Sequence, residues 1–267
     1  MKYLLVLLAL MPLAWAHQEV LANALAAQDR SISSQIVDAI EAAKEQMPCG
    51  FPGLGIPPLA PLKIAHKEIN IDSDALLAIG EIDNFRLYGL NDFDIVQFRI
   101  QAILRKGTFE FNWNHVYLDT DYAMTTRVSG VKMHREGHAK FALKNLRVWG
   151  NFKYSMGILG GSIKLNNFDL YVSVGEVKSE IGGLSKYSII NKKLNQIIEE
   201  WVSLAINDNT NNIPLLTNGY LVPAVNAMIG DLSLSDILGM IGGGSGGGNG
   251  ETGEPVEKVP CIPPEED

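Results

Sequence analysis

Residues 96–121 read VQFRIQAILRKGTFEFNWNHVYLDTD and alternate apolar with polar side chains along most of their length. The apolar positions are Val96, Phe98, Ile100, Ala102 and Leu104, then Phe109, Phe111 and Trp113, then Val116, Leu118 and Thr120. A period of two favours antiparallel strands with one face in water, because strands of a parallel sheet covered on both sides read as continuous apolar runs. The stretch therefore predicts an antiparallel sheet.

The same period extends from Ile64 to about Val177 and predicts which side chains share a face. A related hexapeptide occurs at residues 84–89 (NFRLYG) and 145–150 (NLRVWG), which supports strands at both places. We expect the apolar residues of each alternating strand to face the interior, because a shift of one residue would bury Arg86, Arg99 and Glu110 instead. With two positions from the helix that follows, the expected interior set is Phe85, Leu87, Phe98, Ile100, Phe109, Phe111, Trp113, Val148, Phe168, Leu170, Ile197 and Trp201.

Amphipathic helices are expected on both sides of the strand region. Ile32, Ile36 and Ile40 recur at helical spacing before Pro48. The positions of the second helix are Ile190, Leu194, Ile197, Trp201 and Leu204, and it should end near Asn207. A third helix is expected over residues 215–229, where Pro223 requires a kink.

The two ends of the chain differ in composition from its body. Lys2, the apolar run from Tyr3 to Leu13 and the small-residue step at residues 14–16 are typical of a signal peptide that ends at residue 16. Residues 242–267 are rich in glycine and then in acids, which predicts a disordered tail that is dispensable for folding. A single domain over residues 17–241 remains.

The charge distribution argues against nucleic acid as a partner. The formal net charge is -8, and the segment from Glu251 to Asp267 contributes six acids against Lys258. The body therefore has no basic field that would attract phosphates. No later apolar run is long enough to span a bilayer, and we expect a monomer without a cofactor.

The chain has two cysteines, Cys49 and Cys261. An oxidising compartment permits them to pair, and free or intermolecular thiols are equally open alternatives.

Sequence motifs of catalysis and metal binding lack their structural context. Residues 243–247 (GGSGG) fit a nucleophile-elbow pattern, but they lie in the glycine-rich tail instead of between a strand and a helix. His134 and His138 flank Gly137 in an expected hairpin tip, where exposed histidines need no metal. We therefore expect neither an enzyme nor a metal site.

The amount of one-sided apolar surface is unusual. A long sheet and at least two amphipathic helices must each bury an apolar face, and they can do so in two ways. Their side chains can fill a conventional α+β core, or a mismatch in volume can leave an elongated apolar cavity. The pattern reports which faces are buried and leaves both alternatives open.

The order of these segments resembles the takeout and haemolymph juvenile-hormone-binding family of insects. The resemblance covers about Ser31 to Met240 and rests on the signal peptide, the first helix, Cys49-Gly50, residues 55–62 (GIPPLAPL), 84–90, 122–137 and 143–148, and the C-terminal helices. It implies an α+β fold in which a long, highly curved antiparallel sheet wraps a long C-terminal helix, here the one with Ile197 and Trp201. The sheet and this helix would enclose an apolar tunnel.

The resemblance also implies a function, that of a secreted carrier for a small hydrophobic ligand such as a juvenile-hormone-like terpenoid or a fatty acid. The expected interior set would then line the tunnel. A second reading is an immune or allergen-like protein of the same fold that acts through its surface on bacterial lipid or a protein partner. Under this alternative, the phosphates of a bacterial lipid would meet a modest basic hairpin with Lys132, Arg135, Lys140 and Lys144. Family members commonly have two cysteines near the mature N-terminus, whereas this chain has only Cys49 there.

Overall fold

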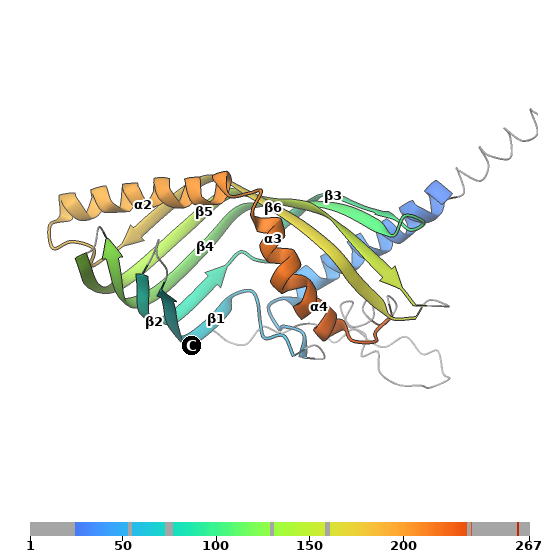
Figure 1. Ribbon diagram of the computed structural model, residues 1–267, viewed down its shortest axis with the longest axis horizontal. Coiled ribbons are helices and arrows are strands. Elements are labelled where there is room, and N and C mark those ends of the chain that lie inside the picture. The colour runs from blue at the N-terminus through green and yellow to red at the C-terminus, as the bar shows by residue number, and fades with distance from the viewer. Residues whose placement is uncertain are drawn as a thin grey trace, which may run out of the picture.

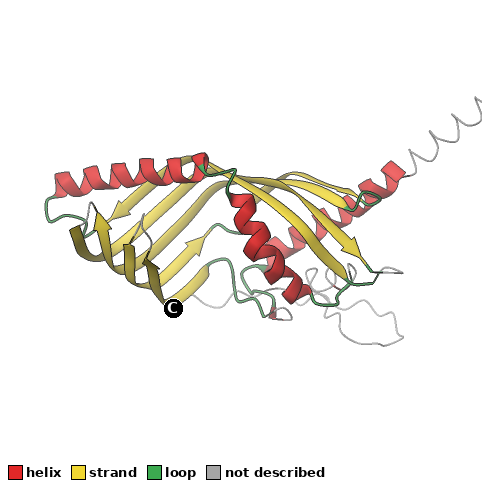
Figure 2. Ribbon diagram, viewed as in Figure 1, coloured by secondary structure: helices red, strands yellow, loops and turns green. Residues whose placement is uncertain are grey.

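A six-stranded antiparallel sheet bordered by helices forms the described part of the protein (Figure 1, Figure 2). The computed structural model describes residues 25–52, 55–72, 77–128, 131–157, 161–233, 236 and 261. Its elements are a helix at residues 25–46, β1 (Leu62–Asp72), β2 (Leu77–Tyr88), β3 (Phe93–Gln101), β4 (Lys106–Val128), β5 (Val131–Met156), β6 (Ile163–Ile181), α2 (Ser188–Asp208), α3 (Ile213–Leu216), the π-helical turn η3 (Thr217–Leu221) and α4 (Val222–Ile229). The predicted signal peptide, residues 1–16, lies outside the described residues, as does the predicted tail, residues 242–267, apart from Cys261.

Strand β4 organises the sheet, because two strands share one of its edges. The strand order is β1-β2-β4-β5-β6, and β3 pairs with β4 off this path. β2 pairs with β4 between Tyr117 and Thr126, whereas β3 pairs with it between Lys106 and Trp113. The 23 residues of β4 would span about 70 Å at the usual rise per residue of a strand. The sheet therefore has two halves in line, a β2 half and a β3 half.

Helical side chains pair with the free edge of β6. From α2, the residues Asn191, Asn195, Glu199 and Asn207 bond backbone groups of Val174, Ser179 and Ile181. From the segment after it, Thr210, Thr217, Asn218 and Asn226 bond backbone groups of Leu165, Phe168 and Val172. These bonds satisfy edge N–H and C=O groups that would otherwise be a template for pairing with another chain. Helix α2 accordingly runs along the border of the sheet (Figure 1).

The N-terminal helix, residues 25–46, covers the free edge of β3 in the same manner. Asp29 Oδ1 accepts a hydrogen bond from the backbone N–H of Ala102 at 3.0 Å, and Ser33 Oγ accepts one from Ile100 at 2.9 Å. At the other end of the helix, Lys44 Nζ donates to the carbonyl oxygen of Phe93 at 2.6 Å. Helices thus border the β3 half of the sheet along both β3 and β6.

A disulfide joins Cys49, just after the N-terminal helix, to Cys261 near the C-terminal end. The question that the sequence left open is thereby answered in favour of pairing. The bridge spans 212 residues, and it ties one residue of the predicted tail to the folded domain. Cys261 is therefore covalently linked to the folded domain, and whether the tail is dispensable for folding stays a prediction.

Two expectations about the strands are wrong in detail. The alternation read from Val96 to Leu104 is interrupted, because a register shift between Ile95 and Gln97 turns Val96 outward, and β3 ends at Gln101. Gly137 is not at a hairpin tip, since β5 continues through it from Val131 to Met156. A Cβ on Gly137 would come within 2.6 Å of the carbonyl oxygen of Gly182, so close backbone approach explains the glycine.

The predicted kink near Pro223 takes the form of a change of helix type. The chain passes from α3 through η3 to α4, with Pro223 in the first turn of α4. Proline lacks a backbone N–H, and the N–H groups of the first turn of a helix have no acceptor within that helix, so proline is tolerated there. No helix among the described residues is long and apolar enough to cross a bilayer.

Candidate ligand-binding face

An aromatic cluster occupies one face of the β3 half, which we call the inner face. Cross-strand pairing places Phe98 opposite Phe109, Phe111 opposite Val148, and Phe152 opposite Phe168. By the same register, Ile100, Trp113 and Leu170 share this face. Eight of the ten strand residues of the expected interior set therefore lie on one face of the β3 half, whereas Phe85 and Leu87 are on β2, where Leu87 pairs with Leu118.

The rings of the inner face contact one another along and across the strands. The ring of Phe109 stacks on that of Phe168 at a centroid distance of 5.3 Å and on that of Phe111 at 5.4 Å. Phe93 lies 5.0 Å from Trp113, whose Nε1 donates to the carbonyl oxygen of Leu90 at 3.1 Å. The cluster is thus a continuous aromatic wall with one indole N–H already satisfied.

Two rings of this wall, Phe93 and Phe152, were missed by the sequence analysis. Phe93 is buried and lies under the ammonium of Lys44, at 4.8 Å from the ring centroid. Phe152 lies near Phe98 and Phe109. Phe152 could have been predicted, because it continues the alternation of Val148 and Gly150. Phe93 could not, because the register shift after Ile95 interrupts its alternation with Phe98.

The polar row of α2, not its apolar stripe, faces β6. The row of Asn191, Asn195 and Glu199 faces β6, and the carboxylate of Glu199 approaches Lys178 of the opposite, outer face at 3.8 Å. Helical geometry places the stripe on the side of α2 that is turned away from this row, in agreement with its exposure. The stripe consists of Ile190, Leu194, Ile197, Trp201 and Leu204.

The apolar stripe of α2 is exposed, whereas the inner face is partly buried, with Phe93, Ile100 and Phe109 at 5 to 7% exposure. Trp201 is 63% exposed and Ile197 is 59% exposed, so the two helical members of the expected interior set are not packed against the sheet. No side chain among the described residues falls below 2% exposure, whereas a solidly packed core would contain several. Within the described part, the apolar stripe of α2 is therefore exposed and not packed against the strands.

The outer face behind the aromatic wall is polar and paired. Glu110 and Arg147 form two hydrogen bonds at 2.8 and 2.9 Å, and this contact lowers the pKa of Glu110. The guanidinium of Arg147 lies over the ring of Trp149, which stacks on Tyr171. Glu110 therefore has its partner on the outer face and does not place a charge among the rings of the inner face.

Histidines and aspartates form a cross-strand chain on the outer face of the β2 half. His66 Nδ1 lies 2.7 Å from Asp83, and that hydrogen bond raises the pKa of His66. His138 Nδ1 lies 2.9 Å from Asp121. Hydrogen bonds from Asn84, the larger effect, and from His138 lower the pKa of Asp121. No group of three or more His, Cys, Asp or Glu residues among those described is placed to hold a metal ion.

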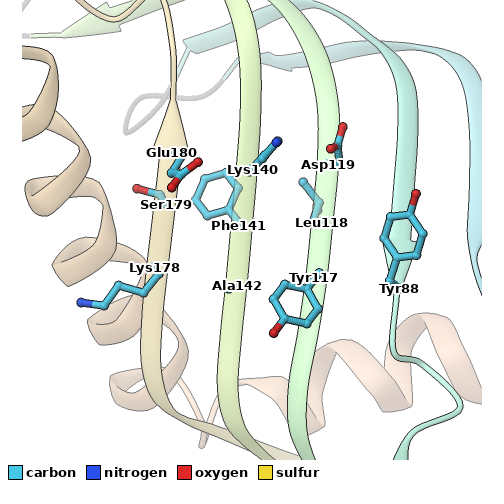
Figure 3. Close-up of a pocket in the computed structure, with 10 residues that line it drawn as sticks. All are labelled: Tyr88, Tyr117, Leu118, Asp119, Lys140, Phe141, Ala142, Lys178, Ser179 and Glu180. Atoms are coloured by element: carbon cyan, nitrogen blue, oxygen red, sulfur yellow. The ribbon is translucent and has the colours of Figure 1, made fainter. Parts of the chain in front are cut away.

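A hollow of about 320 Å³ crosses four neighbouring strands of the β2 half (Figure 3). It is lined by Tyr88, Tyr117, Leu118, Asp119, Lys140, Phe141, Ala142, Lys178, Ser179 and Glu180. Most of these residues are at positions whose side chains point to the outer face, and none belongs to the expected interior set. The hollow is therefore separate from the aromatic wall.

The basic hairpin considered from the sequence is not a single cationic surface. Arg135 has the inner parity and donates to the carbonyl oxygen of Leu184, whereas Lys132, Lys140 and Lys144 have the outer parity. Lys144 is paired with Glu176 at 2.8 Å. The four cations therefore do not converge on one ligand.

The sequence matches the model of the haemolymph juvenile hormone binding protein family over residues 5–239. The chain belongs to this family. The resemblance stated from the sequence is thereby confirmed.

This protein is also similar to two solved structures. Takeout 1 of Epiphyas postvittana matches with a TM-score of 0.48 and 13% identity, covering 75% of this chain and 86% of that protein. A lipopolysaccharide binding protein matches with a TM-score of 0.30 and 10% identity, and the match covers 72% of this chain and 39% of that one. No curated protein sequence matches significantly.

Proposed function

We propose that this protein is a secreted carrier that binds a small hydrophobic ligand between the inner face of its sheet and the apolar stripe of α2. The observation that carries the proposal is the exposure of Trp201 and Ile197 on α2, in a protein whose sheet also has an aromatic wall on one face. Large exposed apolar patches on soluble proteins mark binding sites more often than accidents. Membership in a family of hormone-binding proteins supports the same function.

The chemistry of the two walls favours a long, flexible apolar molecule. Phenylalanine rings and aliphatic side chains supply contact area without directional groups, so a terpenoid such as a juvenile hormone or a fatty acid would suit them. Apolar burial contributes roughly 25 cal/mol per Å² before the costs of association are subtracted. Affinity should therefore rise steeply with ligand length and change little with salt.

The bound ligand would complete a tunnel whose walls are the inner face and α2. It would supply contacts that Phe111 and Trp201 do not make with each other. Secretion belongs to the same proposal and is supported by the apolar stretch that follows Lys2.

Titration of delipidated protein with a fluorescent fatty acid, followed by displacement with unlabelled fatty acids and terpenoids, tests the proposal. Trp201→Glu should weaken binding about tenfold or more, because it places a charge in the apolar site. Ile189→Glu, also on α2 but outside the stripe and 80% exposed, is the matched control. Since both side chains are exposed, neither change should prevent folding.

Saturable binding that Trp201→Glu weakens and Ile189→Glu leaves unchanged would support the carrier. Absence of saturable binding for fatty acids, terpenoids and sterols alike would refute it.

A further inference from the structure

The turn between β3 and β4 presents two aliphatic side chains to solvent at one end of the sheet. Ile103 is 64% exposed and Leu104 is 62% exposed. The backbone N–H of Arg105 donates to the carbonyl oxygen of Ala102 at 3.2 Å, which closes a β-turn with Ile103 and Leu104 at its two corner positions. Both side chains therefore lie at the outermost point of the hairpin.

The residues of this turn contradict the usual chemistry of turns. Corner positions favour Gly, Pro, Asn, Asp and Ser, whereas this turn has Ile and Leu. Arg105 has a φ of 51°, in the left-handed region that glycine or asparagine adopts more easily. Sites where local preferences are violated without a gain in packing are candidates for function.

The turn is held firmly in spite of this. Asp29 accepts a hydrogen bond from the backbone of Ala102, and the N–H of Tyr154 donates to the carbonyl oxygen of Arg105 at 3.0 Å. The exposed pair thus projects from a hairpin fixed to β5 on one side and to the N-terminal helix on the other.

A group of cations lies next to the exposed pair, and we call it the basic collar: Arg99, Arg105, Lys106 and Lys153. By the strand register, Arg99, Lys106 and Lys153 are on the outer face of the sheet. All four are exposed, and the pairing of β4 with β5 places Lys106 opposite Lys153. Like charges directly opposite each other are unfavourable in a sheet. No ion pair within the described part compensates any of the four.

We propose that the β3–β4 turn docks the protein onto an anionic lipid membrane, with Ile103 and Leu104 in the interface and the basic collar on the headgroups. Aliphatic side chains that project beyond a group of cations have the distribution that interfacial anchors show. The chain as a whole has a formal net charge of -8, and Arg127 and Lys132 form a second exposed cationic pair at the β4–β5 turn, so the exposed Ile103 and Leu104 beside the collar distinguish this end. The surface is distinct from the proposed ligand site and does not depend on it.

Flotation of the full-length secreted chain with vesicles tests the proposal. Equimolar phosphatidylcholine and phosphatidylglycerol should bind the protein, and phosphatidylcholine alone should bind it much more weakly. The double variant I103S/L104S should bind anionic vesicles about tenfold more weakly. Removal of collar charges in R99Q/K106Q/K153Q should weaken binding about fivefold per charge.

The controls lie at the opposite end of the sheet. I189S removes an aliphatic side chain that is also highly exposed, and R127Q/K132Q/K140Q removes three exposed cations from the part of β4 and β5 that is remote from the β3–β4 turn. A Leu104→Trp variant adds a direct reading, because its extra emission should shift to the blue on anionic vesicles, whereas that of Ile189→Trp should not.

Loss of binding in the turn and collar variants with retention in both controls would establish the docking surface. The proposal would be overturned if the wild type ignored anionic vesicles, or if the controls lost binding and the turn variants kept it. Displacement of a fluorescent fatty acid should be unaffected in the turn variants, which separates this surface from the carrier function.

Discussion

Asn195 on α2 bonds both backbone groups of Ile181 on β6, as a residue of a neighbouring strand would. Its Oδ1 accepts from the N–H of Ile181 at 2.7 Å, and its Nδ2 donates to the carbonyl oxygen at 3.1 Å. Asn207 repeats the arrangement on Val174, and Asn226 repeats it on Leu165. The helices therefore complete the hydrogen bonding of the sheet edge with side-chain amides and leave the apolar stripe of α2 exposed.

Replacement of Asn195 by leucine should destabilise the protein by about 3 kcal/mol, because each buried polar group left without a partner costs about 1 to 3 kcal/mol. Asn195 is only 7% exposed, so water cannot replace the amide. Asn195→Asp should cause an intermediate loss, since it keeps an acceptor and removes the donor. Urea unfolding measures both, and Asn209→Leu, at an exposed amide that bonds its own helix, is the control. Equal effects at positions 195 and 209 would contradict the role of the edge bonds.

Removal of the disulfide should lower the free energy of unfolding by up to about 5 kcal/mol, because the bridge closes a loop that includes most of the chain. Cys261→Ser, Cys49→Ser and the double variant should be equally destabilised. The wild type in reductant should match them in thermal unfolding. If reduction left the melting temperature unchanged, the tail would be dispensable after all.

His66 should titrate above its ordinary pKa of 6.5, because Asp83 stabilises its charged form. A raised pKa in the folded state means that the His66–Asp83 contact is fully stabilising below pH 6.5 and is lost as the pH rises through the folded value. NMR titration of the ring should show the shift, and Asp83→Asn should abolish it. A pKa at or below 6.5 in the wild type would exclude the contact.

Gly150→Ala should destabilise the protein by more than about 2 kcal/mol, because overpacking shifts backbone and side chains. Its Cβ would collide with the carbonyl oxygen of Asp169 and lie 3.1 Å from the ring of Phe109. Gly219→Ala should change stability by less than about 1 kcal/mol and in the favourable direction, since nothing lies near its Cβ and alanine favours helix. Thermal unfolding of the pair compares them, and similar melting temperatures would contradict the packing at Gly150.

The sequence was informative wherever a period of two continued without interruption. Phe109, Phe111 and Trp113 are on the predicted face because β4 is regular there. The predictions failed at shifts of register, as at Val96, which no local propensity reveals.

The two copies of the Asn-apolar-Arg repeat illustrate the same limit. Asn84 and Asn145 both have a φ of 51° where the pairing skips a residue, so the shared asparagine marks two irregularities of the sheet. The repeat was interpreted only as evidence for strands.

The partners of α2 could not be predicted from periodicity. Its apolar stripe was identified, and contact with the sheet was expected through Ile197 and Trp201. The structure instead uses the polar row of Asn191 and Asn195, because an edge strand needs donors and acceptors more than apolar area.

Quenching of single tryptophans by a brominated fatty acid tests the central claim most directly. Three variants would each retain one of Trp113, Trp149 and Trp201, with phenylalanine at the other tryptophan positions. Bromine quenches at contact, so a ligand between the inner face and α2 should quench Trp113 and Trp201 at saturation and leave Trp149, on the outer face, bright. Quenching of Trp149 to the same extent, or of none of the three, would contradict the account.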